Sequence, residues 1–251
     1  MTLASFMATS APSDGYTLGN IGPEHIIQPI LLGRASYSIK DFIFIGQLAI
    51  IPCVFFTSIE SPWNTFQDFL DHARKNPGVK FSTPGIGTTV YLRAENFNKN
   101  FKTGMVHVPF KGDAESMAAV LGKHVQLGAG SVGIAKAQAD AGKAKILFCF
   151  EPPEKVGLPP NTPNLRTLTA GKPYVDIDPC QLLAVPAKTP SEVTQVLERA
   201  WERLVKDPEF ANDLKSVQLV PGHIDGKTFT QMLPERMAVV KEMLQLSGQL
   251  K

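Results

Sequence analysis

The sequence has few of the features that mark a metal site, a disulfide framework, a membrane span or an export signal. Its three cysteines, Cys53, Cys149 and Cys180, are widely separated and set among apolar residues, which indicates core positions. The five histidines lack the short spacings of metal motifs, so we expect neither a metal nor a cofactor. No apolar run reaches the ~18 residues that cross a bilayer. The first residues show no basic region or apolar core of signal-peptide length.

Strong charge and catalytic motifs are also missing. A net charge of +2 over 251 residues gives no reason to expect nucleic acid or an anionic membrane surface as a partner. The sequence contains no G-x-S-x-G elbow, no Walker loop and no Cys–His signature. A hydrophobic content of 43 % is that of an ordinary globular protein, long enough for one large domain or two lobes.

What the sequence does contain is an alternation of strand and helix patterns. Strands are expected at 16–18, 44–51, 53–57, 79–82, 105–109, 125–127, 145–150 and 181–186. Helices are expected between them, with caps at Asn64, Asp113 and Asp207 and a capping box at Thr189. This alternation predicts an α/β fold with a largely parallel sheet. The proline-rich segment 151–179 is interpreted as a surface excursion.

The clearest local signal is a strand, a glycine-rich turn and a helix within residues 79–100. Val79–Ser82 alternates apolar and polar residues, Pro84–Gly87 favours a turn, and Thr88 is a suitable N-cap. Such a turn aims unpaired backbone N–H groups outward beside the positive end of a helix dipole. Phosphate or a carboxylate could bind there, with the glycines allowing close approach. Alternatively, the two glycines only serve a tight turn, and the local pattern leaves both interpretations open.

Three other loops follow predicted strands and are candidates for the same site. The loop from Asn20 to Glu24 follows the strand at 16–18, at the sheet edge where open α/β sheets place ligands. Lys111 could meet a second negative group, although an ordinary solvated lysine is the simpler interpretation. A turn of small residues is expected at 128–131.

Six motifs in fixed order extend over essentially the whole chain. They are Asp14-Gly15-Tyr16-Thr17-Leu18, Lys40-Asp41-Phe42, Ser82 to Thr89, His107-Val108-Pro109-Phe110-Lys111-Gly112, Ala141-Gly142-Lys143 and Val185 to Pro190. Together they resemble the tripartite tricarboxylate transporter substrate-binding proteins, the Bug or TctC-like group. The resemblance implies a type II periplasmic binding protein fold, with two doubly wound α/β lobes joined by two crossover strands. Lobe I would comprise residues 1–55 and 184–251, and lobe II residues 56–183.

The resemblance also implies a function. A protein of this kind captures a small organic carboxylate, such as a di- or tricarboxylate or an aromatic acid, in the cleft between its lobes. It hands the ligand to a membrane permease, without catalysis, and is a periplasmic monomer. In that family a loop from each lobe holds the ligand carboxylate, and the loop of the second lobe corresponds to Pro84–Thr89. The predicted ligand-binding residues are Pro84, Gly85, Ile86, Gly87, Thr88, Thr89, Asn20, Ile21, Gly22, Lys111 and Ser131.

The chain departs from the family pattern in several places. The signal peptide, first strand, Gly-rich loop and helix that usually precede the segment at 14–18 are not found, so we expect the first lobe to be incomplete. Cys180 and Leu182 replace a tryptophan and a glycine, and Tyr91 stands where histidine is common. Two alternatives follow. One is a truncated remnant with weak or no ligand binding, and the other is an enzyme that uses the Gly-rich loop as an anion site.

Overall fold

The structure is a computed structural model, and it describes residues 2–170 and 172–250. The chain divides into two compact units, one formed by Met1–Ile50 and Ile177–Lys251 and the other by Ile51–Asp176. We call them unit 1 and unit 2. The polypeptide passes between them twice, after Ile50 and after Asp176. The lobe limits expected from the resemblance, at 55/56 and 183/184, stay a prediction.

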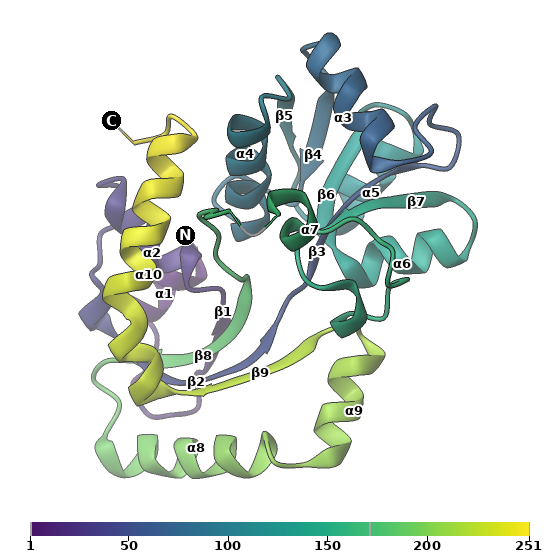
Figure 1. The fold of residues 1–251 in the computed structure, drawn as a ribbon. Helices are drawn as coiled ribbons and strands as arrows, with labels where there is room; N and C mark the ends of the chain where they lie inside the picture. Colours follow the sequence, from purple (N-terminus) through teal and green to yellow (C-terminus); the bar gives the residue numbers. More distant parts are fainter. Residues whose placement is uncertain (1, 171, 251) are drawn as a thin grey trace. The chain divides into compact units, whose positions relative to one another are not determined.

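Unit 1 is built on a four-stranded antiparallel sheet (Figure 1). Its elements are α1 (Leu3–Thr9), β1 (Gly19–Ile21), α2 (Glu24–Leu31), a 3-10 turn (Ile39–Asp41), β2 (Phe42–Ile50), β8 (Cys180–Pro186), α8 (Ser191–Leu204), α9 (Pro208–Ser216), β9 (Val220–Asp225) and α10 (Gly226–Leu246). The strand order is β1-β8-β2-β9. The expectation of a largely parallel sheet is therefore wrong for this unit. Helix α1 and strand β9 were not expected from the sequence.

Unit 2 is built on a five-stranded mixed sheet with the order β5-β4-β6-β3-β7. Its elements are β3 (Cys53–Ser58), α3 (Phe66–Lys75), β4 (Lys80–Thr83), α4 (Thr89–Phe101), β5 (Val106–Pro109), α5 (Asp113–Leu121), β6 (Leu127–Ser131), α6 (Val132–Asp140), β7 (Ala144–Cys149), a 3-10 turn (Pro153–Lys155) and α7 (Leu165–Thr169). β4 is parallel to β5 and β6, whereas β3 is antiparallel to β6 and β7. Four of the five strands therefore share one direction, and the α/β prediction is confirmed.

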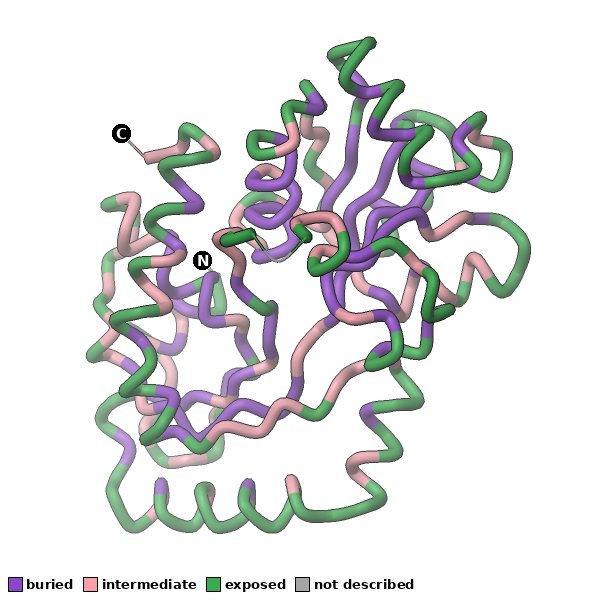
Figure 2. Tube along the Cα trace, viewed as in Figure 1, coloured by how far each residue is buried: buried purple, intermediate pink, exposed green. Residues whose placement is uncertain are grey.

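The hydrophobic core of unit 2 is rich in aromatic side chains. All six residues of β3 are buried, and the ring of Phe55 lies 5.0 Å from that of Phe97 on α4. Phe66 of α3 stacks on Phe148 of β7 at 4.6 Å. The apolar residues of α3, Phe66, Phe69, Leu70 and Ala73, are buried, and Figure 2 shows the strands of this unit as largely buried. The three cysteines occupy core positions, as predicted.

The strand predicted at 16–18 is wrong. Strand β1 begins at Gly19, which pairs with Ala184 of β8. The pairing partner, which is remote in sequence, decides where the strand lies. As a result, Asn20 and Ile21 belong to the strand itself and do not lie in the loop that follows it.

The turn predicted at 128–131 is also wrong, because these residues form most of β6. A Cβ on Gly128 would lie 2.2 Å from the ring of Phe56, so the small residue serves close packing and not a turn.

Three of the five predicted helix caps differ from those in the structure, whereas the cap at Thr88 is confirmed. Helix α3 is capped by Thr65, and α5 by Gly112. Helix α8 has Pro190 at its N-cap, so the capping box at Thr189 is not formed. The cap predicted at Asp207 is confirmed. Asn64 and Asp113 each lie one residue from the true cap, because several neighbouring polar residues could have served.

Candidate functional site

The glycine-rich turn between β4 and α4 has the predicted geometry. Thr88 caps the helix, because its Oγ1 accepts a hydrogen bond from the backbone N–H of Tyr91 (3.1 Å). The same hydroxyl donates to the carbonyl oxygen of Gly85 (2.9 Å), which closes the turn. Gly85 and Gly87 have φ of +148° and +91°, values that glycine adopts without strain. Ile86, at the tip of the turn, is 61 % exposed.

Three strand-to-helix connections meet at one edge of the unit 2 sheet. Strands β5, β4 and β6 are parallel neighbours, so their carboxyl ends lie at the same edge, and helices α5, α4 and α6 begin there. A hydrogen bond from the N–H of Phe110 to the carbonyl of Thr83 (3.2 Å) joins two of these connections. The start of a helix has the positive end of a dipole and N–H groups that the helix itself does not bond. This edge is therefore suited to hold an anion.

Ser131 lies at this edge, but its hydroxyl is already engaged. It donates to Oδ2 of Asp113 (2.7 Å), the first residue of α5. Burial raises the pKa of Asp113, and the hydrogen bonds from Ser131 oppose that shift. Asp113 Oδ1 is buried and has no hydrogen-bond partner within residues 2–170 and 172–250. A second acid, Glu115, also stands in the first turn of α5. Negative charge at the start of this helix limits how much further negative charge the edge can accept.

A half-buried histidine is linked to the glycine-rich turn through Thr83. His107 Nε2 lies 2.7 Å from Thr83 Oγ1, which in turn accepts a hydrogen bond from the N–H of Gly85 (3.3 Å). The imidazole packs on the ring of Tyr91, with ring centres 4.5 Å apart. Burial lowers the pKa of His107 to about 4, so the ring is neutral at pH 7. In the sequence, His107 stands out only as part of a motif, because its contact with the turn depends on the pairing of β4 with β5.

The other predicted residues are placed as follows. Lys111 is exposed, and its backbone N–H donates to Glu115 Oε2 (3.2 Å). The structure brings Lys111 and Ser131 to the same sheet edge as residues 84–89. Asn20, Ile21 and Gly22 belong to unit 1, at the end of β1 and the start of α2.

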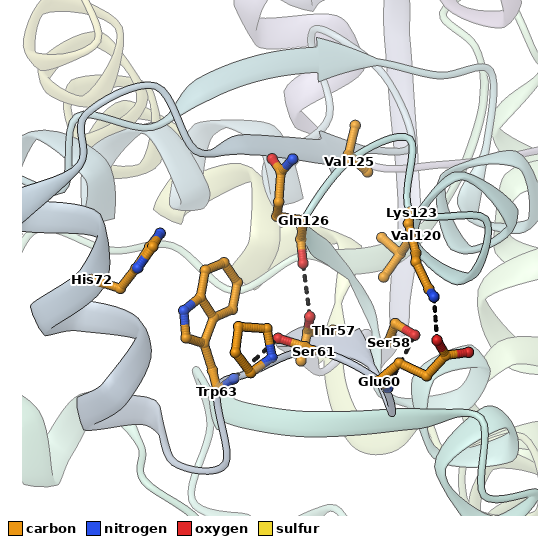
Figure 3. Close-up of a pocket in the computed structure, with 11 residues that line it drawn as sticks. Thr57, Ser58, Glu60, Ser61, Trp63, His72, Val120, Lys123, Val125 and Gln126 are labelled. Atoms are coloured by element: carbon orange, nitrogen blue, oxygen red, sulfur yellow. Dashed lines mark hydrogen bonds and ion pairs between the residues drawn. The ribbon is translucent and has the colours of Figure 1, made fainter.

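A cavity of about 280 Å³ lies at the opposite edge of the unit 2 sheet, where β3 ends and β6 begins (Figure 3). It is lined by Thr57, Ser58, Glu60, Ser61, Pro62, Trp63, His72, Val120, Lys123, Val125 and Gln126. Thr57 Oγ1 donates to the carbonyl of Gln126 (2.7 Å), and Glu60 forms an ion pair with Lys123. The predicted ligand-binding residues do not contribute to this lining.

Two further findings concern metal ligands and membrane-spanning helices. Across the residues that the structure describes, no group of three or more His, Cys, Asp or Glu side chains is arranged to hold a metal ion. Within residues 2–170 and 172–250, every helix is too short or too polar to span a bilayer.

Comparison with known proteins identifies the class of the molecule. The solved structure of R. palustris Rpa4515 with adipate is 21 % identical, with a TM-score of 0.86 over 98 % of this chain and 82 % of that one. MatC from Rhodopseudomonas palustris with bound malate is 20 % identical, with a TM-score of 0.79 over 97 % and 84 %. The fold is thus that of the type II periplasmic binding proteins.

The family follows from sequence. The family model TctC, described as the tripartite tricarboxylate transporter family receptor, matches residues 1–248. The chain therefore belongs to this family of solute-binding proteins. A UPF0065 protein from the gbd 5' region of Cupriavidus necator is 27 % identical over 246 residues, covering 98 % of this chain and 73 % of the relative. The resemblance stated from the motifs is confirmed.

Proposed function

We propose that the chain captures a small organic carboxylate, a di- or tricarboxylate or an aromatic acid, and delivers it to the membrane permease of a tripartite tricarboxylate-type transporter. We infer that it does so as a periplasmic monomer and without catalysis. The observation that carries the proposal is the start of three helices at one sheet edge, beside a turn with two glycines at positive φ. The adipate and malate named with two similar structures support the carboxylate class.

The proposed contacts are those expected from the sequence. We infer that backbone N–H groups within residues 85–89 and the hydroxyl of Thr89 contact one carboxylate, while the hydroxyl of Thr88 holds the turn closed through the Gly85 carbonyl. Lys111 is available to a second negative group. Asn20, Ile21, Gly22 and Ser131 complete the proposed set. Capture between the two lobes, as the resemblance implies, stays a prediction.

The charges at the sheet edge favour a carboxylate over a phosphate at this turn. Residues 84–89 contain no charged side chain, and the first turn of α5 carries the acids Asp113 and Glu115. A phosphate dianion would bring twice the charge of a carboxylate close to these acids, whereas the N–H groups and helix dipoles supply only fractional positive charge. At this turn, one carboxylate group of a ligand therefore fits the electrostatics better than a phosphate group.

Thermal unfolding against a panel of mono-, di- and tricarboxylates and aromatic acids tests the proposal. A ligand at 100 times its dissociation constant adds about 2.7 kcal/mol, which raises Tm by roughly 5–10 °C for a chain of this size. If no acid raises Tm, the alternative of a truncated remnant with weak or no ligand binding is favoured. Turnover of any acid would favour the enzyme alternative.

A matched pair of glycine variants locates the site. Gly87→Ala strains the proposed turn, where φ is +91°, and should abolish the ligand-induced shift. Gly78→Ala imposes comparable strain at φ +103° in the connection between α3 and β4, and should destabilise the fold while leaving the shift intact. If both variants lose the ligand-induced Tm shift equally, the turn at Gly87 is not part of the ligand site.

A further inference from the structure

Helix α4, which begins at the glycine-rich turn, carries a buried arginine. The side chain of Arg93 is only 1 % exposed and lies one turn into the helix. A buried guanidinium is costly unless its donors are satisfied by charged partners. Arg93 Nε and Nη2 donate to the two carboxylate oxygens of Asp176, at 2.8 and 2.5 Å. Its Nη1 donates to Glu151 Oε1, and the ring of Phe150 lies 4.5 Å from its central carbon.

Glu151 connects this arginine to the first passage between the units. The chain enters unit 2 at Ile51, and two residues later the N–H of Cys53 donates to Glu151 Oε2 (2.8 Å). The carbonyl of Cys53 accepts a hydrogen bond from the N–H of Phe150 (2.9 Å). The first passage is thereby linked to Arg93 through one buried carboxylate.

Asp176 connects the same arginine to the second passage, since it is the last residue of unit 2. The residues before it follow α4 in the opposite direction. Asn96 donates through its side-chain amide to the carbonyl of Val175 (2.5 Å), and the ring of Phe101 stacks on Tyr174 at 6.0 Å. Residues 174–176 therefore lie along successive turns of α4, with Asp176 nearest the glycine-rich turn. The interpretation of 151–179 as only a surface excursion is wrong for Glu151 and Asp176.

We propose that Arg93 is a positioning residue that ties both passages between the units to the helix that forms the carboxylate turn. This inference rests on the proposed function for its consequence, which is that ligand contact at the turn is transmitted to both passages. Arginine suits the role because its planar fork bonds two carboxylates in fixed geometry, whereas lysine offers a single compact charge. One guanidinium on α4 thus bonds Asp176 directly and the Cys53 backbone through Glu151, in one hydrogen-bonded cluster.

Amide hydrogen exchange in the free protein tests the link without any ligand. Asp176→Asn weakens the pair with Arg93, and we expect exchange at the amides of Cys53 and Tyr91 to become about tenfold faster. Asp140→Asn makes the same chemical change in an ion pair with Lys136 on the surface of α6, and should leave both amides unchanged. Unchanged exchange at Tyr91 in the Asp176 variant would overturn the proposal.

A second variant keeps the test decisive if the first variant misfolds. Arg93→Lys keeps the positive charge but cannot bond both carboxylates in the same geometry, so it should raise exchange at the same two amides. The amide of Val106, the first residue of β5, is bonded to the carbonyl of Val79 and serves as the internal reference. Faster exchange at all three amides would indicate general loosening, and would count against a positioning role.

Adipate is the probe for the functional consequence. In the unaltered protein we expect adipate to slow exchange at both Tyr91 and Cys53. In Asp176→Asn it should slow exchange at Tyr91 alone. Slowing at both amides in the variant would refute the transmission. If adipate slows neither amide in the unaltered protein, the proposed function fails for this acid, while the comparison of the free proteins still decides whether Arg93 links the turn to the passages.

Discussion

The N-cap of α4 gives the sharpest test of the ligand turn, because α3 carries an equivalent cap away from it. Thr88 Oγ1 accepts from the N–H of Tyr91 at 3.1 Å, and Thr65 Oγ1 accepts from the N–H of Asp68 at 3.1 Å. Thr→Val at either position keeps the β-branched shape and removes the hydroxyl. We therefore expect similar losses of stability and different effects on ligand binding.

The expected magnitudes follow from these contacts. Loss of an N-cap costs about 1 kcal/mol, which lowers Tm by roughly 2–4 °C in either variant. Thr88 has a second role, because its hydroxyl also donates to the carbonyl of Gly85 (2.9 Å) and closes the turn. Thr88→Val should therefore also weaken carboxylate binding about tenfold, since one lost hydrogen bond and a looser turn together amount to about 1.4 kcal/mol.

Thermal unfolding and isothermal titration with the acid that gives the largest shift provide the two measurements. Thr65→Val should lose stability but retain affinity. If Thr88→Val binds the acid as tightly as the unaltered protein, the turn does not contact the ligand. If both variants lose affinity equally, binding reports global stability and the assignment of the turn is unsupported.

Three further predictions concern stability and are measured by urea unfolding. Gly128→Ala should cost about 1–3 kcal/mol, because the new Cβ would lie 2.2 Å from the buried ring of Phe56; a neutral result would mean that the ring moves aside freely. The pKa of His107 is about 4 in the folded state and near 6.5 in the unfolded state, so the unfolded chain binds more protons between these pH values, and the free energy of unfolding should fall as the pH drops from 6.5 to 4. His107→Gln should make this fall smaller. If the variant has the same pH profile as the unaltered protein, another group causes the pH dependence. Arg236→Met removes the guanidinium that pairs with the fully buried Glu24 and should lower the free energy of unfolding by about 3–5 kcal/mol. Adding Glu24→Gln should restore part of this stability. If it restores none, the loss comes from side-chain packing and not from the unpaired carboxylate.

The glycine-rich turn could be predicted because its signals are local. A strand pattern, two glycines and a capping threonine occur within a few residues, and each acts on its immediate neighbours. The same holds for the cap of α9 at Asp207. The order of the motifs then extended this local result to the family and the fold.

Features that depend on distant partners could not be predicted in this way. Glu151 and Asp176 are 58 and 83 residues from Arg93 in sequence, and in isolation each resembles an ordinary surface charge. Strand β1 is placed by its pairing with β8, and Gly128 is small because of a ring on β3. In each case the deciding contact is made only when segments that are distant along the chain come together.

The distribution of charge also bears on how a carrier releases its ligand. Residues 84–89 have no charged side chain, and His107, which contacts the neighbouring Thr83, is neutral at pH 7. The guanidinium of Arg93 is bonded to two carboxylates. Attraction at the turn therefore comes from backbone N–H groups and helix dipoles, whose fractional charges bind an anion less strongly than a desolvated arginine would. Under the proposed function, delivery of the ligand to a permease needs such reversible binding. The buried arginine stabilises the helix and the passages between the units, and leaves the ligand turn free of a fixed positive charge.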